Sequence, residues 1–351
     1  MRKTTTRGIL ERLKQGVVLG AEGYVFELER RGYIKAGPYV PEVVLDFPKA
    51  VKELHREFLR AGSEVMVALT YYAHREKLKD VGREHDLEWM NRQAVRLANE
   101  VAREGDALVA GNICNTNVYQ PEDKTALNTV RAMFEEQIAW AADEQADFVI
   151  GETFYFGGEA QIALQAIREA GLPAVMTLAV PATGTLLDGY APAEAAAMLA
   201  DGGAEVVGLN CFRGPATTMP LLKGIRDAVS CHVAALPVPY RTTERHPTFF
   251  TLPDSGDGGG SVPGGRPFPT ALEPLLCNRY EVARFAQEAH ALGVRYLGVC
   301  CGNAPHYTRA VAEALGRTPP ASRYSPDMSK HFAFGTDPSL NKQTLSLSGL
   351  L

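Results

Sequence analysis

Cysteines are the residues in this sequence with the most specific chemistry. There are six, at positions 114, 211, 231, 277, 300 and 301. Residues 1–6 lack the apolar run of a secretory signal, so we expect a cytoplasmic chain whose thiols stay reduced. Reduced thiols serve as inert core residues, nucleophiles or metal ligands. The role of each cysteine depends on where the secondary-structure elements place it.

Composition sets broad limits on what the chain does. It has 351 residues, 46% of them hydrophobic, which is enough for a substantial core. The formal net charge of −5 gives no basic surplus for binding nucleic acid. No apolar stretch reaches the roughly 18 residues that a membrane span needs. We therefore expect partners that are neither nucleic acids nor membranes.

Short apolar runs alternate with longer amphipathic segments along the chain. The runs lie at residues 17–20, 64–70, 107–111, 148–151, 174–178, 205–209, 232–236 and 295–299. Helices are predicted at 42–61, 86–104, 124–145, 158–170, 192–202, 217–229, 279–292 and 304–316. This alternation predicts an α/β fold with a parallel sheet and helical crossovers. Eight units favour a closed (β/α)₈ TIM barrel, with an open doubly wound sheet as the alternative.

Two segments interrupt the pattern. The stretch 240–275 follows the seventh run and contains the glycine-rich residues 255–261, so it predicts a long loop. We hypothesise that this loop closes over substrate as a lid. Residues 319–351 show little periodicity and predict a C-terminal tail or arm that needs a partner surface. The predicted organisation is one barrel domain, 1–318, and a tail, 319–351.

Barrel enzymes place their chemistry where strands end and loops begin. The predicted strand ends carry Tyr71-Tyr72, Glu152-Thr153, Asn210-Cys211 and Cys300-Cys301. Three cysteines, 211, 300 and 301, would then meet at one face, whereas 114, 231 and 277 are interpreted as structural thiols. Three thiolates suit Zn²⁺, which keeps a fourth position open in catalytic sites. A thiol substrate in that position would be held as the nucleophilic thiolate.

The segments that carry these cysteines resemble a known family. Gly208-Leu209-Asn210-Cys211 and Gly298-Val299-Cys300-Cys301-Gly302 are similar to the two zinc motifs of the homocysteine S-methyltransferase family. Residues 7–13, 35–38, 54–63 and 104–111 resemble its betaine–homocysteine branch, and the likeness extends over roughly 7–322. The resemblance implies a zinc-dependent enzyme. Its reaction would move a methyl group from a betaine-like quaternary ammonium or sulfonium donor to the thiol of homocysteine, giving methionine.

The resemblance also implies roles for individual residues. Cys211, Cys300 and Cys301 match the zinc ligands, and Glu152 matches a carboxylate that holds the amino group of the acceptor. Tyr72 and Tyr39 match aromatic positions of the donor pocket, where the betaine enzyme typically has Trp in place of Tyr39. Tyr71 either joins that aromatic wall or packs as an ordinary core tyrosine.

One position departs from the family pattern. The family usually carries an acidic residue directly after the glycine of the first strand, whereas this chain reads Gly20-Ala21-Glu22-Gly23. A shift of one residue turns a strand side chain to the opposite face, although a loop at the strand end can relax it. We hypothesise that Glu22 contacts the acceptor amine. The alternative is a different thiol acceptor.

Several functions stay open at this point. The methyl donor could be betaine, another betaine, dimethylsulfoniopropionate or S-methylmethionine. A non-catalytic zinc or thiol sensor on the same barrel is an alternative from another class. A phosphate-binding barrel is weakly indicated, because the glycine-rich loop lacks the Lys-Ser/Thr end of a phosphate loop. We expect a homo-oligomer that binds a small thiol acceptor and a methyl donor.

Overall fold

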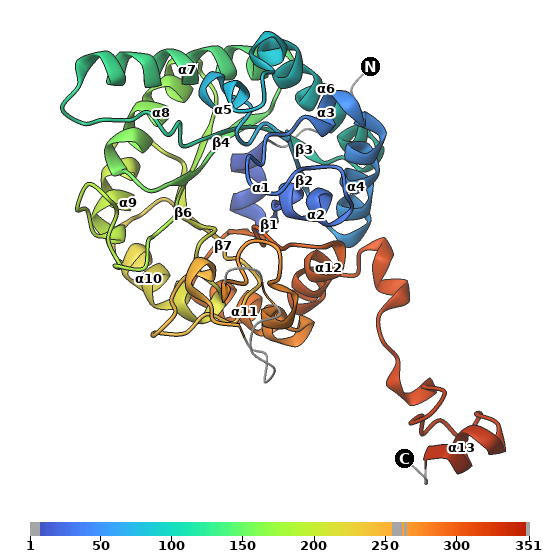
Figure 1. The fold of residues 1–351 in the computed structure, drawn as a ribbon. Helices are drawn as coiled ribbons and strands as arrows, with labels where there is room; N and C mark the ends of the chain where they lie inside the picture. The colour runs from blue at the N-terminus through green and yellow to red at the C-terminus, as the bar shows by residue number, and fades with distance from the viewer. Residues whose placement is uncertain (1–7, 255–261, 263–264, 349–351) are drawn as a thin grey trace.

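Eight parallel strands form a ring in the computed structural model (Figure 1), which describes residues 8–254, 262 and 265–348. The strands are β1 Val18–Leu19, β2 Val65–Val67, β3 Leu108–Cys114, β4 Phe148–Phe154, β5 Ala174–Leu178, β6 Val206–Asn210, β7 His232–Leu236 and β8 Tyr296–Leu297. Their order in the sheet is β1-β8-β7-β6-β5-β4-β3-β2. A parallel bridge between Gly20 and Val65 joins the two ends of this sheet. The predicted TIM barrel is therefore confirmed.

Helices surround the ring. Those that cross between successive strands are α4 Pro48–Ala61, α6 Leu87–Gly105, α7 Lys124–Asp143, α8 Gly157–Glu169, α9 Pro192–Asp201, α10 Pro215–Ala228 and α11 Arg279–Ala291. The others are α1 Ile9–Gln15, α2 Tyr24–Arg30, α3 Val43–Asp46, α5 Arg75–Lys79, α12 Pro305–Ala314, which follows β8, and α13 Lys342–Ser348. Single-turn 3₁₀ helices lie at η1 Glu84–Asp86, η2 Phe249–Thr251, η4 Glu273–Leu275, η5 Pro320–Tyr324 and η6 Met328–Lys330.

Each of the eight apolar runs contains a strand, because parallel strands covered by helices are buried on both faces. β3 and β4 extend beyond the predicted runs and end at Cys114 and Phe154. Glu152 thus lies inside β4 rather than after it. The helix predicted at 42–61 is divided at Phe47, where Pro48 disfavours helical geometry in the preceding residue and α4 begins anew.

The irregular segments lie at the ends of the barrel. The loop after β7 contains η2 and η4, whereas its glycine-rich stretch 255–261 falls outside the described residues, so the lid stays a prediction. After η5 the chain leaves the barrel as an arm that carries α13 (Figure 1). The described ranges contain no helix that is both long and apolar enough to cross a bilayer.

Candidate functional site

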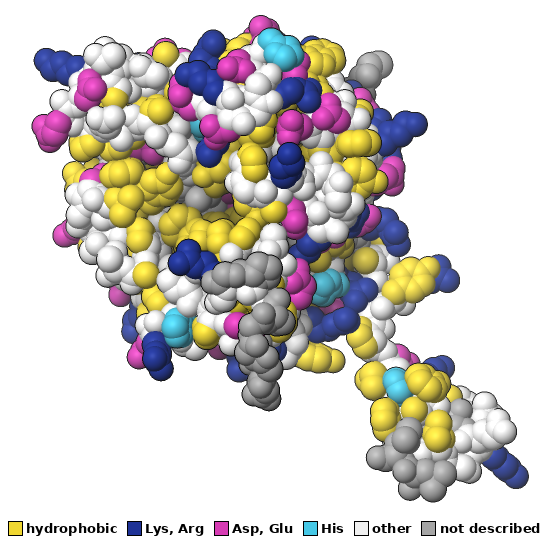
Figure 2. All heavy atoms as spheres, in the orientation of Figure 1, with side chains coloured by type: hydrophobic (Ala, Val, Ile, Leu, Met, Phe, Trp, Pro, Cys, Tyr) yellow, Lys and Arg dark blue, Asp and Glu magenta, His cyan; other side chains and the backbone are white. Residues whose placement is uncertain are grey.

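A cavity of about 190 Å³ lies at the carboxyl ends of the strands. Figure 2 shows hydrophobic side chains around the hollow at this face of the barrel. All eight predicted site residues line the cavity, although they come from five strand ends and a loop: Glu22, Tyr39, Tyr71, Tyr72, Glu152, Cys211, Cys300 and Cys301. The closed ring explains this convergence, because it brings the carboxyl ends of all its strands to one mouth.

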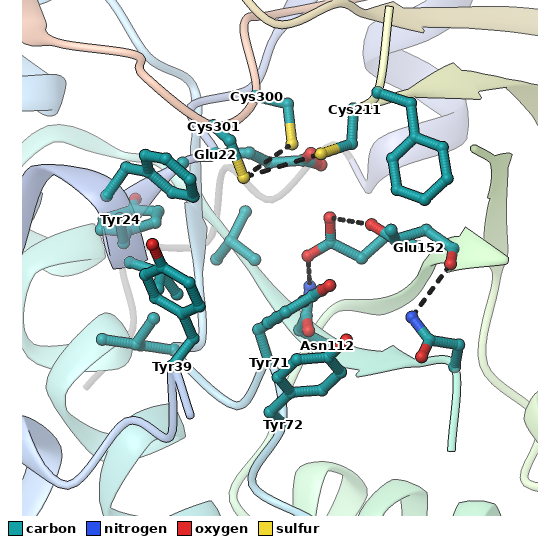
Figure 3. Close-up of a pocket in the computed structure, with 18 of the residues that line it drawn as sticks. Glu22, Tyr24, Tyr39, Tyr71, Tyr72, Asn112, Glu152, Cys211, Cys300 and Cys301 are labelled. Atoms are coloured by element: carbon teal, nitrogen blue, oxygen red, sulfur yellow. Dashed lines mark hydrogen bonds between the residues drawn. The ribbon is translucent and has the colours of Figure 1, made fainter. Parts of the chain in front are cut away.

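Three sulfurs point toward one another in this cavity (Figure 3). Cys211 Sγ lies 3.6 Å from Cys301 Sγ, which lies 3.9 Å from Cys300 Sγ. Zinc–sulfur bonds of about 2.3 Å in a tetrahedral site place two sulfurs roughly 3.8 Å apart. The cysteines are unpaired thiols, and all three ligand atoms lie within 4.8 Å of one another. Their spacing and chemistry therefore fit a soft metal ion.

The three thiols ionise as a group. Hydrogen bonds with the Cys300 and Cys301 thiols lower the pKa of Cys211 to about 5. Hydrogen bonds with the Cys211 and Cys300 thiols, followed by burial, raise the pKa of Cys301 well above its ordinary value. One thiolate is thus shared among three sulfurs. A metal cation that binds all three would displace the remaining protons.

The other three cysteines stay apart from the cluster. The described lining of the cavity includes neither Cys114, Cys231 nor Cys277. Cys114 ends β3, where its sulfur accepts a hydrogen bond of 3.3 Å from the backbone N–H of Tyr72. Burial raises the pKa of Cys277 to about 12, which keeps it a neutral thiol. These placements agree with structural roles.

Two carboxyl groups face the cavity beside the sulfurs. Oxygens of Glu22 and Glu152 and the sulfur of Cys300 all lie within 4.8 Å of one another. Burial raises the pKa of Glu152 to about 8, with the nearby Cys300 adding to the shift. Burial and then the Glu152 charge raise the pKa of Glu22 well above its ordinary value. Two acids in one dry site favour a bound cation.

Two asparagines that the sequence did not assign to the site hold Glu152. Asn112 Nδ2 donates to one carboxylate oxygen at 2.5 Å, and Asn210 Nδ2 donates to the other at 2.8 Å. Asn210 also accepts a hydrogen bond of 2.9 Å from the backbone N–H of Thr153. Asn210 directly precedes Cys211 at a predicted strand end, a signal that could have identified it. Asn112 directly follows the third apolar run, which is the same kind of signal, and it lies in the unpredicted extension of β3.

Aromatic rings form the wall opposite the cysteines. Tyr71 and Tyr72 lie side by side (Figure 3), with ring centroids 4.3 Å apart. Tyr39 stacks on Phe26 with centroids 5.3 Å apart. Further rings that the sequence analysis missed also line the cavity: Tyr24, Phe26, Tyr155, Phe212, Phe249, Phe250 and Phe268. Tyr24 and Phe26 lie in α2, and the others lie in loops or in the short helix η2, where aromatic residues carry no periodic signal.

The lining carries no positive charge. Among the described residues that line the cavity there is no Lys, Arg or His, so its ionisable groups are carboxyls, thiols and phenols. Acidic groups and aromatic faces together attract cations. The cavity is therefore suited to positively charged ligands that approach a cluster of thiols.

Comparison with known proteins places these features in a family. The sequence profile of the homocysteine S-methyltransferase family matches residues 22–315. Betaine–homocysteine S-methyltransferase 1 of Xenopus tropicalis is 40% identical over 341 residues, covering 94% of this chain and 80% of that protein. The S-methylmethionine–homocysteine S-methyltransferase BHMT2 of Mus musculus is 39% identical over 342 residues, covering 94% and 86%.

Solved structures give the same fold. The homocysteine methyltransferase MmuM from Escherichia coli, in its oxidized form, aligns with a TM-score of 0.66 and 19% identity, covering 87% of this chain and 97% of that one. Its metallated form aligns with a TM-score of 0.65, covering 85% and 96%. At this identity the likeness supports the barrel alone.

Proposed function

The chain belongs to the homocysteine S-methyltransferase family, and we propose that it transfers a methyl group from a betaine-like donor to the thiol of homocysteine, giving methionine. One observation carries this proposal. Three sulfurs, two carboxyls and an aromatic wall face the same cavity. The sulfurs match a thiol, the carboxyls match an amine, and the aromatic rings match a methylated cation.

Zinc is the metal that we propose for the sulfur cluster. Cys211, Cys300 and Cys301 would hold it, because zinc accepts three thiolates and leaves a position for substrate. When bound, zinc keeps the acceptor sulfur as a thiolate at neutral pH. Since such a cluster needs reduced thiols, we propose a cytoplasmic location.

The acceptor is held by its amino group. Glu152 presents a carboxyl group whose two oxygens accept hydrogen bonds from Asn112 and Asn210, which orient it in the cavity. Glu22 presents a second carboxyl within the same 4.8 Å cluster, which supports the hypothesis that it replaces the displaced family acid. An ammonium group between them would be held by charge-assisted hydrogen bonds. This places the acceptor thiol toward the cysteines.

The donor is held by its positive charge. Aromatic faces attract a quaternary ammonium or sulfonium group by about 0.5–2 kcal/mol each. Tyr39, Tyr71 and Tyr72 supply such faces across the cavity from the cysteines. A methyl group of the donor would then lie between the rings and the acceptor sulfur.

Transfer from this arrangement is a single displacement. A bond forms between the acceptor sulfur and the methyl carbon, and the bond from that carbon to the donor nitrogen or sulfur breaks with its electron pair. The leaving group departs neutral, so no general base has to remove a proton from the donor. The side chains therefore contribute orientation, charge and exclusion of water.

Metal analysis tests the first half of this proposal. We expect close to one zinc ion per chain in the purified protein, and its loss in Cys211→Ala and in Cys301→Ala. The matched control is Cys277→Ala, which removes a buried thiol outside the cavity and should keep the metal. Stoichiometric iron, or no metal in the unaltered protein, would contradict the zinc assignment.

Turnover tests the second half. Homocysteine is incubated with betaine, dimethylsulfoniopropionate or S-methylmethionine, and methionine is measured by mass spectrometry. We expect methionine with betaine. Methionine with another donor alone would correct the donor, because relatives named for betaine and for S-methylmethionine are equally similar to this chain. No methylated thiol with any donor would favour the sensor.

A further inference from the structure

One segment of backbone supports both cysteine loops. It leaves β7, which lies between β6 and β8 in the sheet. The backbone N–H of Cys211, after β6, donates to the carbonyl oxygen of Leu236 at 3.0 Å, and the N–H of Cys300, after β8, donates to that of Pro237 at 2.9 Å. Two consecutive carbonyls therefore fix two cysteines that are 89 residues apart in the sequence.

Tyr240, four residues beyond β7, packs against both loops. Its side chain is completely buried. A β-carbon on Gly214, three residues after Cys211, would lie 2.0 Å from the carbonyl oxygen of Tyr240. A β-carbon on Gly302, directly after Cys301, would lie 2.6 Å from the hydroxyl oxygen of Tyr240. The backbone of Tyr240 thus touches one cysteine loop and its ring touches the other.

Arg30 holds the ring in place. Its Nη2 donates to the hydroxyl oxygen of Tyr240 at 3.0 Å, and its Nε lies 3.3 Å from a carboxylate oxygen of Glu273. Phe249 stacks on the ring with centroids 5.7 Å apart. The ring is therefore fixed by α2 on one side and by the loop after β7 on the other.

We propose that Tyr240 is a positioning residue that sets the distance between the thiols of Cys211 and Cys301. It is not among the described residues that line the cavity, so it acts through the two loops rather than on a ligand. Removing its ring opens a space beside Gly302, into which the Cys301 turn can relax. The proposal uses the proposed metal as one reporter, but the thiol geometry exists without it.

The first test measures how tightly the metal is held. Tyr240→Leu removes the ring, Tyr240→Phe removes only the hydroxyl, and Phe285→Leu shrinks another buried ring in α11 as a control for lost packing. In competition with a chromophoric chelator, we expect Tyr240→Leu to weaken zinc affinity about tenfold or more, the size typical for groups that orient metal ligands. Tyr240→Phe should fall in between, and Phe285→Leu should match the unaltered protein.

A second measurement needs no metal. The metal-free protein is oxidised with diamide, which takes two electrons and two protons from a pair of thiols as their disulfide forms, and the products are mapped by mass spectrometry. Folding is checked by circular dichroism. We expect the unaltered protein to link Cys211 with Cys301, whose sulfurs are 3.6 Å apart, and Tyr240→Leu to do so at least about fivefold more slowly.

The outcomes separate the two proposals. Equal linking rates in folded Tyr240→Leu and in the unaltered protein would overturn the role of Tyr240, as would equal losses of zinc affinity in Tyr240→Leu and Phe285→Leu. An unaltered protein without metal would instead remove the zinc assignment, while the linking rates would still decide the role of Tyr240.

Discussion

Glu22 and Glu152 are two acids in one cavity, but their surroundings differ. Glu152 has an amide donor on each oxygen, from Asn112 and Asn210. Neither oxygen of Glu22 has an amide or hydroxyl donor among the described residues, and its polar neighbour is the carboxyl group of Glu152. A buried carboxylate without donors is costly, so Glu22 either holds a proton or faces a cation. The protonation state of Glu22 should therefore change when the amino group of the acceptor binds.

Replacing this carboxyl should weaken acceptor binding. Glu22→Gln removes one charge facing the ammonium group, and hydrogen bonds to charged groups contribute about 1.5–3 kcal/mol. We expect the KM for homocysteine to rise at least about tenfold while the KM for the methyl donor stays constant. Steady-state kinetics with each substrate varied in turn measures both values. An unchanged KM for homocysteine would remove Glu22 from the acceptor site.

The same residue should make stability depend on pH. In the folded, ligand-free protein the pKa of Glu22 is raised above its ordinary value of 4.5, so the folded state keeps a proton that the unfolded state has released. The free energy of unfolding should then fall as pH rises above about 4.5. Glu22→Gln removes this dependence, so it should raise Tm more at pH 8 than at pH 5. Thermal melts of the metal-free protein measure this, and equal gains at both pH values would contradict it.

Much of the site could be predicted one residue at a time. Reading the residue after each apolar run brought the three cysteines and Glu152 to one face. Asn112 also directly follows an apolar run, but an asparagine at a strand end reads equally well as a loop residue, and its role appears only where it donates to Glu152. Glu22 stayed uncertain because a one-residue shift in register can only be judged once the loop after β1 is seen.

At the scale of elements, several strand ends adopt left-handed backbone without glycine. Tyr72, Thr153 and Cys211 have φ values of 59°, 59° and 54°, and all three line the cavity. Each such conformation costs about 1–3 kcal/mol of folding free energy and persists where the surrounding packing enforces it. Sequence cannot reveal these turns, because the usual marker of positive φ is glycine.

Gly23 is a left-handed position that is occupied by glycine, and it lies against the Cys300 loop. Its φ is +82°, and a β-carbon there would lie 2.4 Å from the carbonyl oxygen of Cys300. Gly32, with φ +79° and nothing within 4 Å of the same position, is a matched control. Both Gly→Ala changes should cost on the order of 1 kcal/mol through the backbone, whereas only Gly23→Ala should also weaken zinc binding.

Urea unfolding and chelator competition distinguish these two effects. We expect both variants to lose a similar amount of unfolding free energy through the backbone. Gly23→Ala should lose further stability and metal affinity, because the Cys300 carbonyl must move. Identical behaviour of the two variants would mean that the Cys300 loop tolerates the displacement.

The fold itself was largely predictable, for a physical reason. Strands buried on both faces leave continuous apolar runs, and the runs recur with the crossover helices. Element ends were less predictable. The break at Phe47 depends on the effect of Pro48 on its neighbour, and the extensions of β3 and β4 depend on polar residues finding partners inside the barrel.

At the scale of the molecule, the arm is the part that the barrel does not explain. Residues 319–325 still contact the barrel, as in the hydrogen bond between Arg309 and the carbonyl oxygen of Ala321. The boundary at 318 stays a prediction. Beyond residue 325 the arm points away from the barrel (Figures 1 and 2). Its side chains of Phe332 and Phe334 are 75% and 54% exposed.

Exposed aromatic rings on a projecting arm indicate a surface that a partner covers, because each ring left in water forfeits about 1.5–3 kcal/mol of burial. We propose that the partner is a second copy of this chain, and we expect a homo-oligomer at micromolar concentration.

Removing residues 327–351 should yield a folded monomer. The paired variant Phe332→Ser and Phe334→Ser should weaken association while leaving the fold of the barrel and its metal binding unchanged, since neither residue lines the cavity. Analytical ultracentrifugation measures the mass of each form. A monomeric full-length protein, or a truncated form that keeps its oligomeric mass, would show that the arm serves another partner.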